Sequence, residues 1–144
     1  MIARVLYARA IAATFVAVVA LALTACKDAT TATSPTTTSP VTELFSGQIN
    51  VGGTAARAFT AAASGTVTLT LSQIGPPADL VVGFGIGIPQ SNGSGCYLTQ
   101  SVNTGASSTP QLTVPVDAGA YCLRLNDLGT MKSPTAFTVT IVRP

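Results

Sequence analysis

The chain has 144 residues, of which 47% are hydrophobic and only 8% are charged, and it has a formal net charge of +2 and no histidine. The lack of histidine excludes His-dependent catalytic triads and the commonest zinc ligand. The few basic residues form no cluster that could follow a phosphate backbone, so we expect no nucleic-acid partner.

The N-terminal segment has the order of an export signal. Arg4 and Arg9 are the only charges before an apolar run over residues 10–25, and this order is typical of a basic n-region followed by an h-region. The run is shorter than the roughly 20 residues that a membrane-spanning helix needs. We therefore predict a helical signal peptide over residues 1–25 in preference to a transmembrane helix.

The apolar run ends at Leu23-Thr24-Ala25-Cys26, which resembles the lipobox of bacterial envelope lipoproteins. The resemblance implies that Cys26 carries a diacylglyceryl group, starts the mature chain and anchors it to a membrane, since two acyl chains suffice for stable anchoring. The alternative is an ordinary secretory signal that Cys26 merely follows. Lys27 stands where enterobacterial lipoproteins of the inner membrane have aspartate, which favours an outer-membrane location in the cell envelope.

The number of cysteines supports the same interpretation. An exported chain with three cysteines leaves one unpaired unless one of them is modified. If Cys26 carries lipid, Cys96 and Cys122 remain for a disulfide that closes a loop of about 26 residues and contributes ~3.5 kcal/mol in the chain-entropy model. Two free buried thiols are the alternative.

Residues 26–42 are predicted to form a disordered tether after the anchoring cysteine. The segment is rich in threonine, serine and proline and lacks apolar periodicity, so it cannot bury a core. From residue 26 onward the basic and acidic residues balance, and the mature chain is formally neutral. These residues are Lys27, Arg57, Arg124, Lys132 and Arg143 against Asp28, Glu43, Asp79, Asp117 and Asp127.

Residues 43–144 are expected to fold as one all-β domain. The clearest strand spans residues 66–72, where apolar residues alternate with hydroxyl-bearing ones. In the strand over 120–126, Cys122 and Arg124 share the face opposite the core, which would place the disulfide outside a sheet. About eight strands joined by short turns predict an antiparallel β-sandwich that is jelly-roll-like. The other strands are expected near residues 44–50, 55–61, 80–89, 96–102, 111–116 and 137–141.

The strand over residues 80–89 has glycines on one face and apolar side chains on the other. Gly83, Gly85 and Gly87 alternate with a set that ends at Ile88. A strip of glycines permits close approach either by a ligand or by another part of the same domain, so a binding face and intramolecular covering both stay open. Tyr97 is the one aromatic residue placed to serve such a face as a stacking platform, and packing over the disulfide is its alternative.

The segment over residues 59–71, FTAAASGTVTLTL, resembles the opening of the bacterial pre-peptidase C-terminal domain. Residues 78–80 and 117–125 are similar to the acidic turn and the closing Ala-Gly-Thr-Tyr segment of that family. The resemblance implies an accessory β-sandwich with roles in secretion, substrate adhesion and sometimes calcium binding. Of the family's acidic cluster only Asp79 remains, and Asp117, Asn126 and Asp127 lie elsewhere, whereas calcium takes 6–8 oxygen ligands. We expect no metal or cofactor.

These observations together predict a non-catalytic protein of the cell envelope that is held to the membrane by Cys26. Its β-sandwich is expected to be an interaction or structural module whose partner is an envelope protein or a glycan. A surface adhesin or carbohydrate-binding module is the alternative, and an exposed Tyr97 would favour it.

Overall fold

The computed structural model describes residues 39–91 and 95–144. The predicted signal peptide, Cys26 and most of the predicted tether lie outside the described residues. Each expected strand is present, and the all-β prediction is confirmed. The strands are β1 (Val41–Ile49), β2 (Thr54–Ala61), β3 (Gly65–Gly75), β4 (Val82–Pro89), β5 (Cys96–Thr104), β6 (Leu112–Val116), β7 (Gly119–Asp127) and β8 (Thr135–Arg143).

Within these ranges, no helix combines the length and the apolar character needed to span a lipid bilayer. The first strand begins at Val41, two residues before the predicted start of the domain, because Val41 and Thr42 pair with Arg143 and Val142 of β8.

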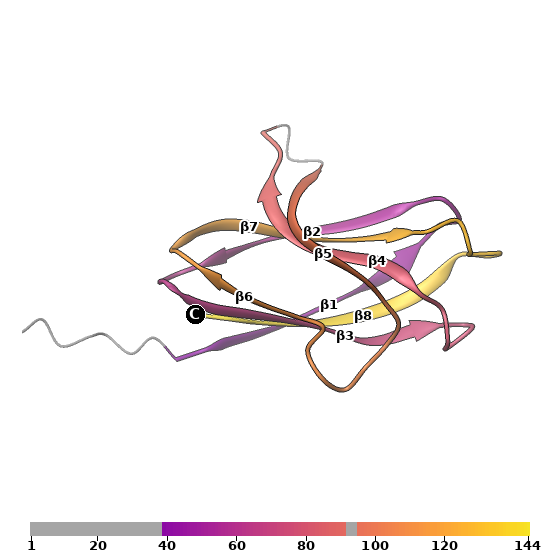
Figure 1. Ribbon diagram of the computed structural model, residues 1–144, viewed down its shortest axis with the longest axis horizontal. Coiled ribbons are helices and arrows are strands. Elements are labelled where there is room, and N and C mark those ends of the chain that lie inside the picture. Colours follow the sequence, from indigo (N-terminus) through magenta and orange to yellow (C-terminus); the bar gives the residue numbers. More distant parts are fainter. Residues whose placement is uncertain (1–38, 92–94) are drawn as a thin grey trace, which may run out of the picture. The chain divides into compact units, whose positions relative to one another are not determined.

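The eight strands form two antiparallel four-stranded sheets that pack as a sandwich (Figure 1). Sheet 1 has the order β1-β8-β3-β6, and sheet 2 has the order β2-β7-β4-β5. The antiparallel pairs β1–β8, β2–β7, β3–β6 and β4–β5 are nested, as in one long hairpin rolled into two layers. This arrangement is the jelly roll, and the predicted jelly-roll character is confirmed.

The core lies between the sheets and follows the period of two in the sequence. Val67, Leu69 and Leu71 of β3 are fully buried, and Val82 and Phe84 of β4 face them from sheet 2. Burying each of these side chains contributes roughly 1.5–3 kcal/mol. In β7 the alternation places Leu123 and Leu125 in the core and Cys122 and Arg124 on the outer side, as predicted.

Two β-bulges interrupt the alternation. In β3, the register moves by one residue between Leu71 and Gln73, so Ser72 is the extra residue, and its hydroxyl donates to the Thr138 carbonyl at 3.1 Å. Thr99 is the extra residue of β5, and its hydroxyl donates to the Ile86 carbonyl at 3.2 Å. A bulge bends its strand and increases the local twist, so β3 and β5 both change direction at these points.

The outer face of sheet 1 is uncharged and rich in hydroxyl groups. Because the core residues alternate with outward ones, every outward position of its four strands can be assigned. We name this surface the hydroxyl face. Its residues are Thr42, Leu44, Ser46 and Gln48 of β1, Ala136, Thr138, Thr140 and Val142 of β8, Thr66, Thr68, Thr70, Ser72 and Gln73 of β3, and Thr113 and Pro115 of β6.

Charges lie instead at the seam where the edge strands β1 and β2 meet. Arg57 of β2 donates through Nε and Nη2 to Glu43 Oε1 of β1, at 3.1 and 2.8 Å. The second oxygen of Glu43 lies 3.7 Å from Arg143 Nη2, and the Arg57 guanidinium lies 6.0 Å from the ring centre of Phe45. These contacts join the two sheets along one edge and cover the aromatic side chain beneath them.

The carboxylate of Asp127 organises one end of the sandwich. One of its oxygens accepts from the Gly52 backbone N–H at 2.8 Å, and the other accepts from the N–H groups of Gly129, Thr130 and Met131 at 2.9 to 3.2 Å. The hydrogen bond from Gly52 and those from the three later residues lower the pKa of Asp127 below its ordinary value. The carboxylate therefore ties the β1–β2 turn to the β7–β8 loop.

We predict that the Asp127→Asn substitution destabilises the domain at neutral pH but not in strong acid. The amide nitrogen cannot accept a hydrogen bond, so part of the cluster is left unpaired. Because the folded pKa is lowered, the contribution of the carboxylate is present above the unfolded pKa of about 3.9 and is lost as the pH falls through the folded pKa. Thermal unfolding between pH 7 and pH 2 should show a lower Tm for the variant at pH 7 and convergence at the acid end.

The matched control is Asp79→Asn, since Asp79 is an exposed turn carboxylate without a side-chain hydrogen bond to any described residue. This variant should unfold like the unmodified chain throughout. A Tm difference for Asp127→Asn that stays constant down to pH 2 would contradict the role of its ionised form.

Candidate functional site

The most distinctive element of the domain is the end of the β4–β5 hairpin. Strand β4 pairs with β7 only as far as Gly87, and beyond that residue it pairs with β5 alone. We call the described residues of this end, 88–91 and 95–98, the arm. Figure 1 shows the arm rising away from the two layers of the sandwich. At the far end of these residues, the Gln90 N–H donates to the Gly95 carbonyl at 3.0 Å.

The three glycines of β4 are buried beneath the protein's own chain. A Cβ on Gly87 would lie 1.7 Å from the Tyr97 carbonyl oxygen, and one on Gly85 would lie 2.8 Å from the Leu98 side chain. A Cβ on Gly83 would meet the side-chain amide of Asn126 at 2.6 Å. Of the two alternatives for this strip, the structure shows intramolecular covering, so the glycines offer no open surface to a ligand.

A disulfide between Cys96 and Cys122 holds the arm against the outer side of sheet 2. The Cα atoms are 5.8 Å apart, and both residues are 2% exposed. Cys122 lies directly across from Gly87 in the β4–β7 pair, and Arg124 Nη1 donates to the Cys96 carbonyl at 3.4 Å. The predicted pair is therefore present and lies outside the sheet, where the covering arm shields it from solvent.

Tyr97 and Ile88 form an exposed cross-strand pair on the arm. Tyr97 is 68% exposed and Ile88 is 55% exposed. The expectation that Ile88 shares the buried face of Val82, Phe84 and Ile86 is wrong, because the bulge after Ile86 turns the arm away from the core. The exposed ring of Tyr97 is available as a platform on an arm that the disulfide holds in place.

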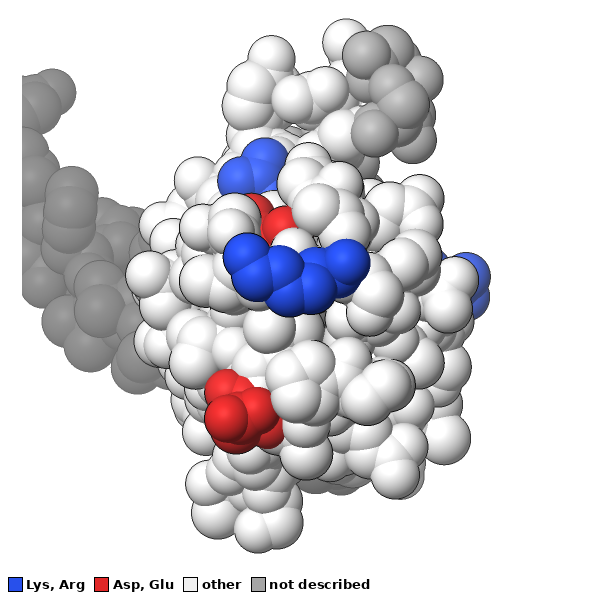
Figure 2. Space-filling view, turned by 90° about the vertical axis from the view of Figure 1, so that its right-hand side faces the viewer, with Lys and Arg blue, Asp and Glu red and all other residues white. Residues whose placement is uncertain are grey.

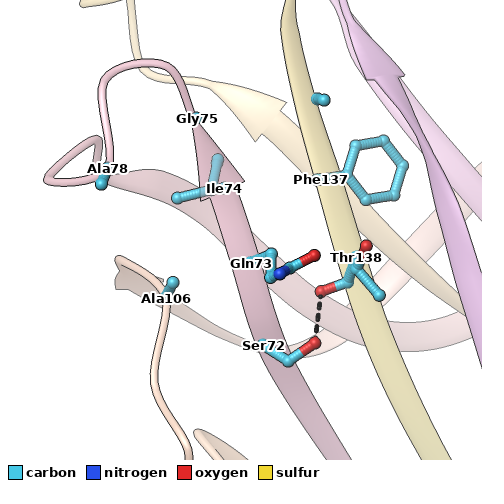
Figure 3. A pocket seen from close by; sticks show the side chains of 9 residues that line it. Ser72, Gln73, Ile74, Gly75, Ala78, Ala106, Phe137 and Thr138 are labelled. Carbon is cyan, nitrogen blue, oxygen red and sulfur yellow. Dashed lines mark hydrogen bonds between the residues drawn. The ribbon is translucent and has the colours of Figure 1, made fainter.

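A second candidate site is a pocket at the bulged end of the hydroxyl face. Its volume is about 430 Å³, and it is lined by β3, β8, the β3–β4 turn and the β5–β6 loop. Figure 3 shows Ala78 and Ala106 on one side of β3 and Thr138, on β8, on the other. The polar groups at the pocket are the Ser72 hydroxyl, the Gln73 amide and the Thr138 hydroxyl, and the rest of the lining is apolar.

The sequence contained a signal for this pocket that the prediction did not use. In the run Leu71-Ser72-Gln73-Ile74, two polar residues in succession separate two buried ones, and such a break in the alternation is the mark of a bulge. The pocket itself depends on which loops reach that bulge, and the local sequence does not contain that information.

The described residues contain no cluster of metal-ligating side chains at either candidate site. Within residues 39–91 and 95–144, no three histidine, cysteine, aspartate or glutamate side chains come together in a way that could hold a metal ion. Figure 2 shows the right-hand end of the sandwich with few blue or red atoms on a mostly white surface. None of the residues that line the pocket is charged.

Comparison with known protein families finds no match for this chain, and a search of curated proteins finds none either.

We predict that removing the disulfide frees the arm and leaves the sandwich folded. In the double variant Cys96→Ala/Cys122→Ala, the chain-entropy model gives a loss of about 3.5 kcal/mol in the free energy of unfolding. Hydrogen exchange at β3 and β8, whose pairing does not involve the arm, should become faster only by the amount that the loss of global stability sets, whereas exchange at residues 88–91 and 95–98 should become faster by more than that amount. An equal increase in the hydrogen-exchange rate of the arm and of β3 and β8 would contradict a local role of the disulfide.

The glycine strip gives a second prediction with a matched control. Gly87→Ala places a methyl group on the Tyr97 backbone carbonyl, so we expect a loss of roughly 1–3 kcal/mol, as for overpacked cores. Gly119→Ala is the control, since its Cβ would meet nothing closer than the Tyr121 ring at 3.9 Å. Denaturant unfolding should separate the two variants. Equal stabilities would show that the arm does not lie against Gly87 in solution.

Proposed function

We propose that this protein is a lipid-anchored component of the bacterial cell envelope whose β-sandwich is a non-catalytic binding module. The observation that carries the proposal is the pairing of cysteines. The Cys96–Cys122 bond uses two of the three cysteines of the chain. It leaves Cys26, the cysteine of the lipobox-like sequence, as the one available for lipid.

The disulfide also supports an exported location. Structural disulfides persist in oxidising compartments and are rare in the cytosol. A stapled arm that carries an exposed aromatic residue suits a binding role, because a rigid element loses little conformational freedom when it binds. Lys27 favours the outer membrane, and the threonine-rich segment before residue 43 would serve as the spacer between membrane and domain.

A carbohydrate-binding module or surface adhesin is the second candidate function, and one observation favours it. Tyr97 is 68% exposed beside the exposed side chain of Ile88. An aromatic ring with an apolar neighbour can stack on the C–H face of a sugar and can also donate through its hydroxyl group. The resemblance to the pre-peptidase C-terminal domain agrees with an accessory adhesive role.

The anchor is tested by the intact mass of the full-length gene product purified from membranes of its native host. We expect cleavage before Cys26, a mass increase that corresponds to two or three acyl chains, and loss of that increase in the Cys26→Ala variant. The control is Cys96→Ala/Cys122→Ala, which should keep the lipid. An unmodified chain with a different first residue would refute the anchored form of the proposal.

A further inference from the structure

The hydroxyl face of sheet 1 is an uncharged surface that extends over four strands. Only 8% of the chain is charged, and none of the outward positions on β1, β8, β3 and β6 is charged among the described residues. The charges near β1 lie at the seam with β2, where Glu43 pairs with Arg57. A partner can therefore cover the hydroxyl face without removing any ion from water, which is the most costly step in burying polar surface.

The hydroxyl groups on this face form a regular series. Thr140 of β8 pairs with Thr70 of β3, and the next outward pair along these strands is Thr138 with Gln73. Neighbouring strands are about 4.8 Å apart, and outward residues repeat about every 6.8 Å along a strand. Hydroxyl groups therefore recur at outward positions of β3 and β8, between the apolar residues Ala136 and Val142 on β8, and each hydroxyl can donate one hydrogen bond and accept others.

The pocket at the bulge gives this face a concave end. Its volume of about 430 Å³ falls within the 300–1,000 Å³ that is usual for small-ligand sites. The Ser72 hydroxyl donates to the Thr138 carbonyl, and the Thr138 hydroxyl accepts from Ser46. Gln73 also lines the pocket, and its side chain is exposed, so its amide is accessible to a ligand.

We propose that the hydroxyl face and the pocket at its bulged end bind a neutral polysaccharide. This inference rests on the proposed binding module and names its ligand class. The polar groups present are hydroxyls and one amide, which match the hydroxyl groups of a neutral sugar, while Ala78 and Ala106 offer an apolar wall to its C–H face. A polymer that repeats its hydroxyl groups can contact both the pocket and the threonine rows along β3 and β8.

A protein partner fits the same surface less well. Protein interfaces concentrate aromatic residues and arginine in their buried centres, and the hydroxyl face has neither. Leu44 is its one large apolar side chain with high exposure, at 66%. A second copy of the chain would therefore bury little apolar area on this face.

The test is calorimetric titration of the full-length chain with neutral oligosaccharides, namely cellohexaose, xylohexaose, mannohexaose and chitohexaose. We expect at least one of them to bind. Gln73→Ala removes the amide of the pocket, and Thr140→Lys places a charge in the centre of the face. Each change should weaken that binding by about tenfold, the effect of leaving one hydrogen-bonding group of the complex unpaired.

Thr60→Lys is the matched control, since Thr60 is an exposed position on β2 of the other sheet, and it should bind like the unmodified chain. Thermal unfolding of every variant separates loss of binding from loss of folding. Tyr97→Ala tells the two candidate surfaces apart, because weaker binding in this variant would move the site to the arm and overturn the proposal.

Two further results would overturn the inference. One is the absence of binding to all four oligosaccharides at millimolar concentration. The other is self-association that Thr140→Lys abolishes, measured by sedimentation, which would make the face an interface between copies. Neither result changes the intact mass at Cys26, so failure of this inference is distinguishable from failure of the lipid anchor.

Discussion

The distinctive part of this domain depends on one close approach between backbones. The carbonyl of Tyr97 lies where a side chain at position 87 would begin, and only glycine permits that contact. Because β5 can lie so close to β4, Leu98 and Cys96, which follow one another on the same side of β5 beyond the bulge at Thr99, lie over the outer side of sheet 2. Cys96 then reaches Cys122, and Leu98 covers Gly85. The glycine strip, the bulge and the disulfide thus act together to hold the arm. Strand pairing alone would attach the arm only at its base.

The arm makes the two outer faces of the sandwich different. Leu98 and Cys96 of the arm cover part of the outer side of sheet 2, whereas the outward residues of sheet 1 are exposed or half-buried in the part of the chain that the structure describes. Apart from Arg124 on the outer side of sheet 2, the charged side chains of the described residues lie at the seam and at the turns and loops, with Asp127 tying two turns together and Glu43 joining β1 to β2. The charged residues that stabilise the turns and the seam therefore lie away from the hydroxyl face, and that face is uncharged.

Much of the fold follows from short-range patterns in the sequence. Alternation in segments such as residues 66–72 predicts the strands, and an even number of cysteines beyond Cys26 predicts the disulfide. The exposure of Ile88 and the pocket at Ser72 were not predicted, because each depends on a bulge that shifts the register by one residue. The hydroxyl face escaped prediction for a related reason. The threonines of β3 and β8 are each visible in the sequence, but their alignment into rows is a property of strand pairing between distant segments.

The central claim of this account is that Cys96 and Cys122 bond to each other, which both fixes the arm and leaves Cys26 for lipid. The most direct test is disulfide mapping of the full-length chain after thiol blocking and chymotryptic digestion without reductant. Cleavage after Tyr97 and Tyr121 separates the two cysteines, so the account predicts one linked pair of peptides containing Cys96 and Cys122, with Cys26 absent from any disulfide. A peptide that joins Cys26 to either of the other cysteines, or free thiols at Cys96 and Cys122, would contradict it.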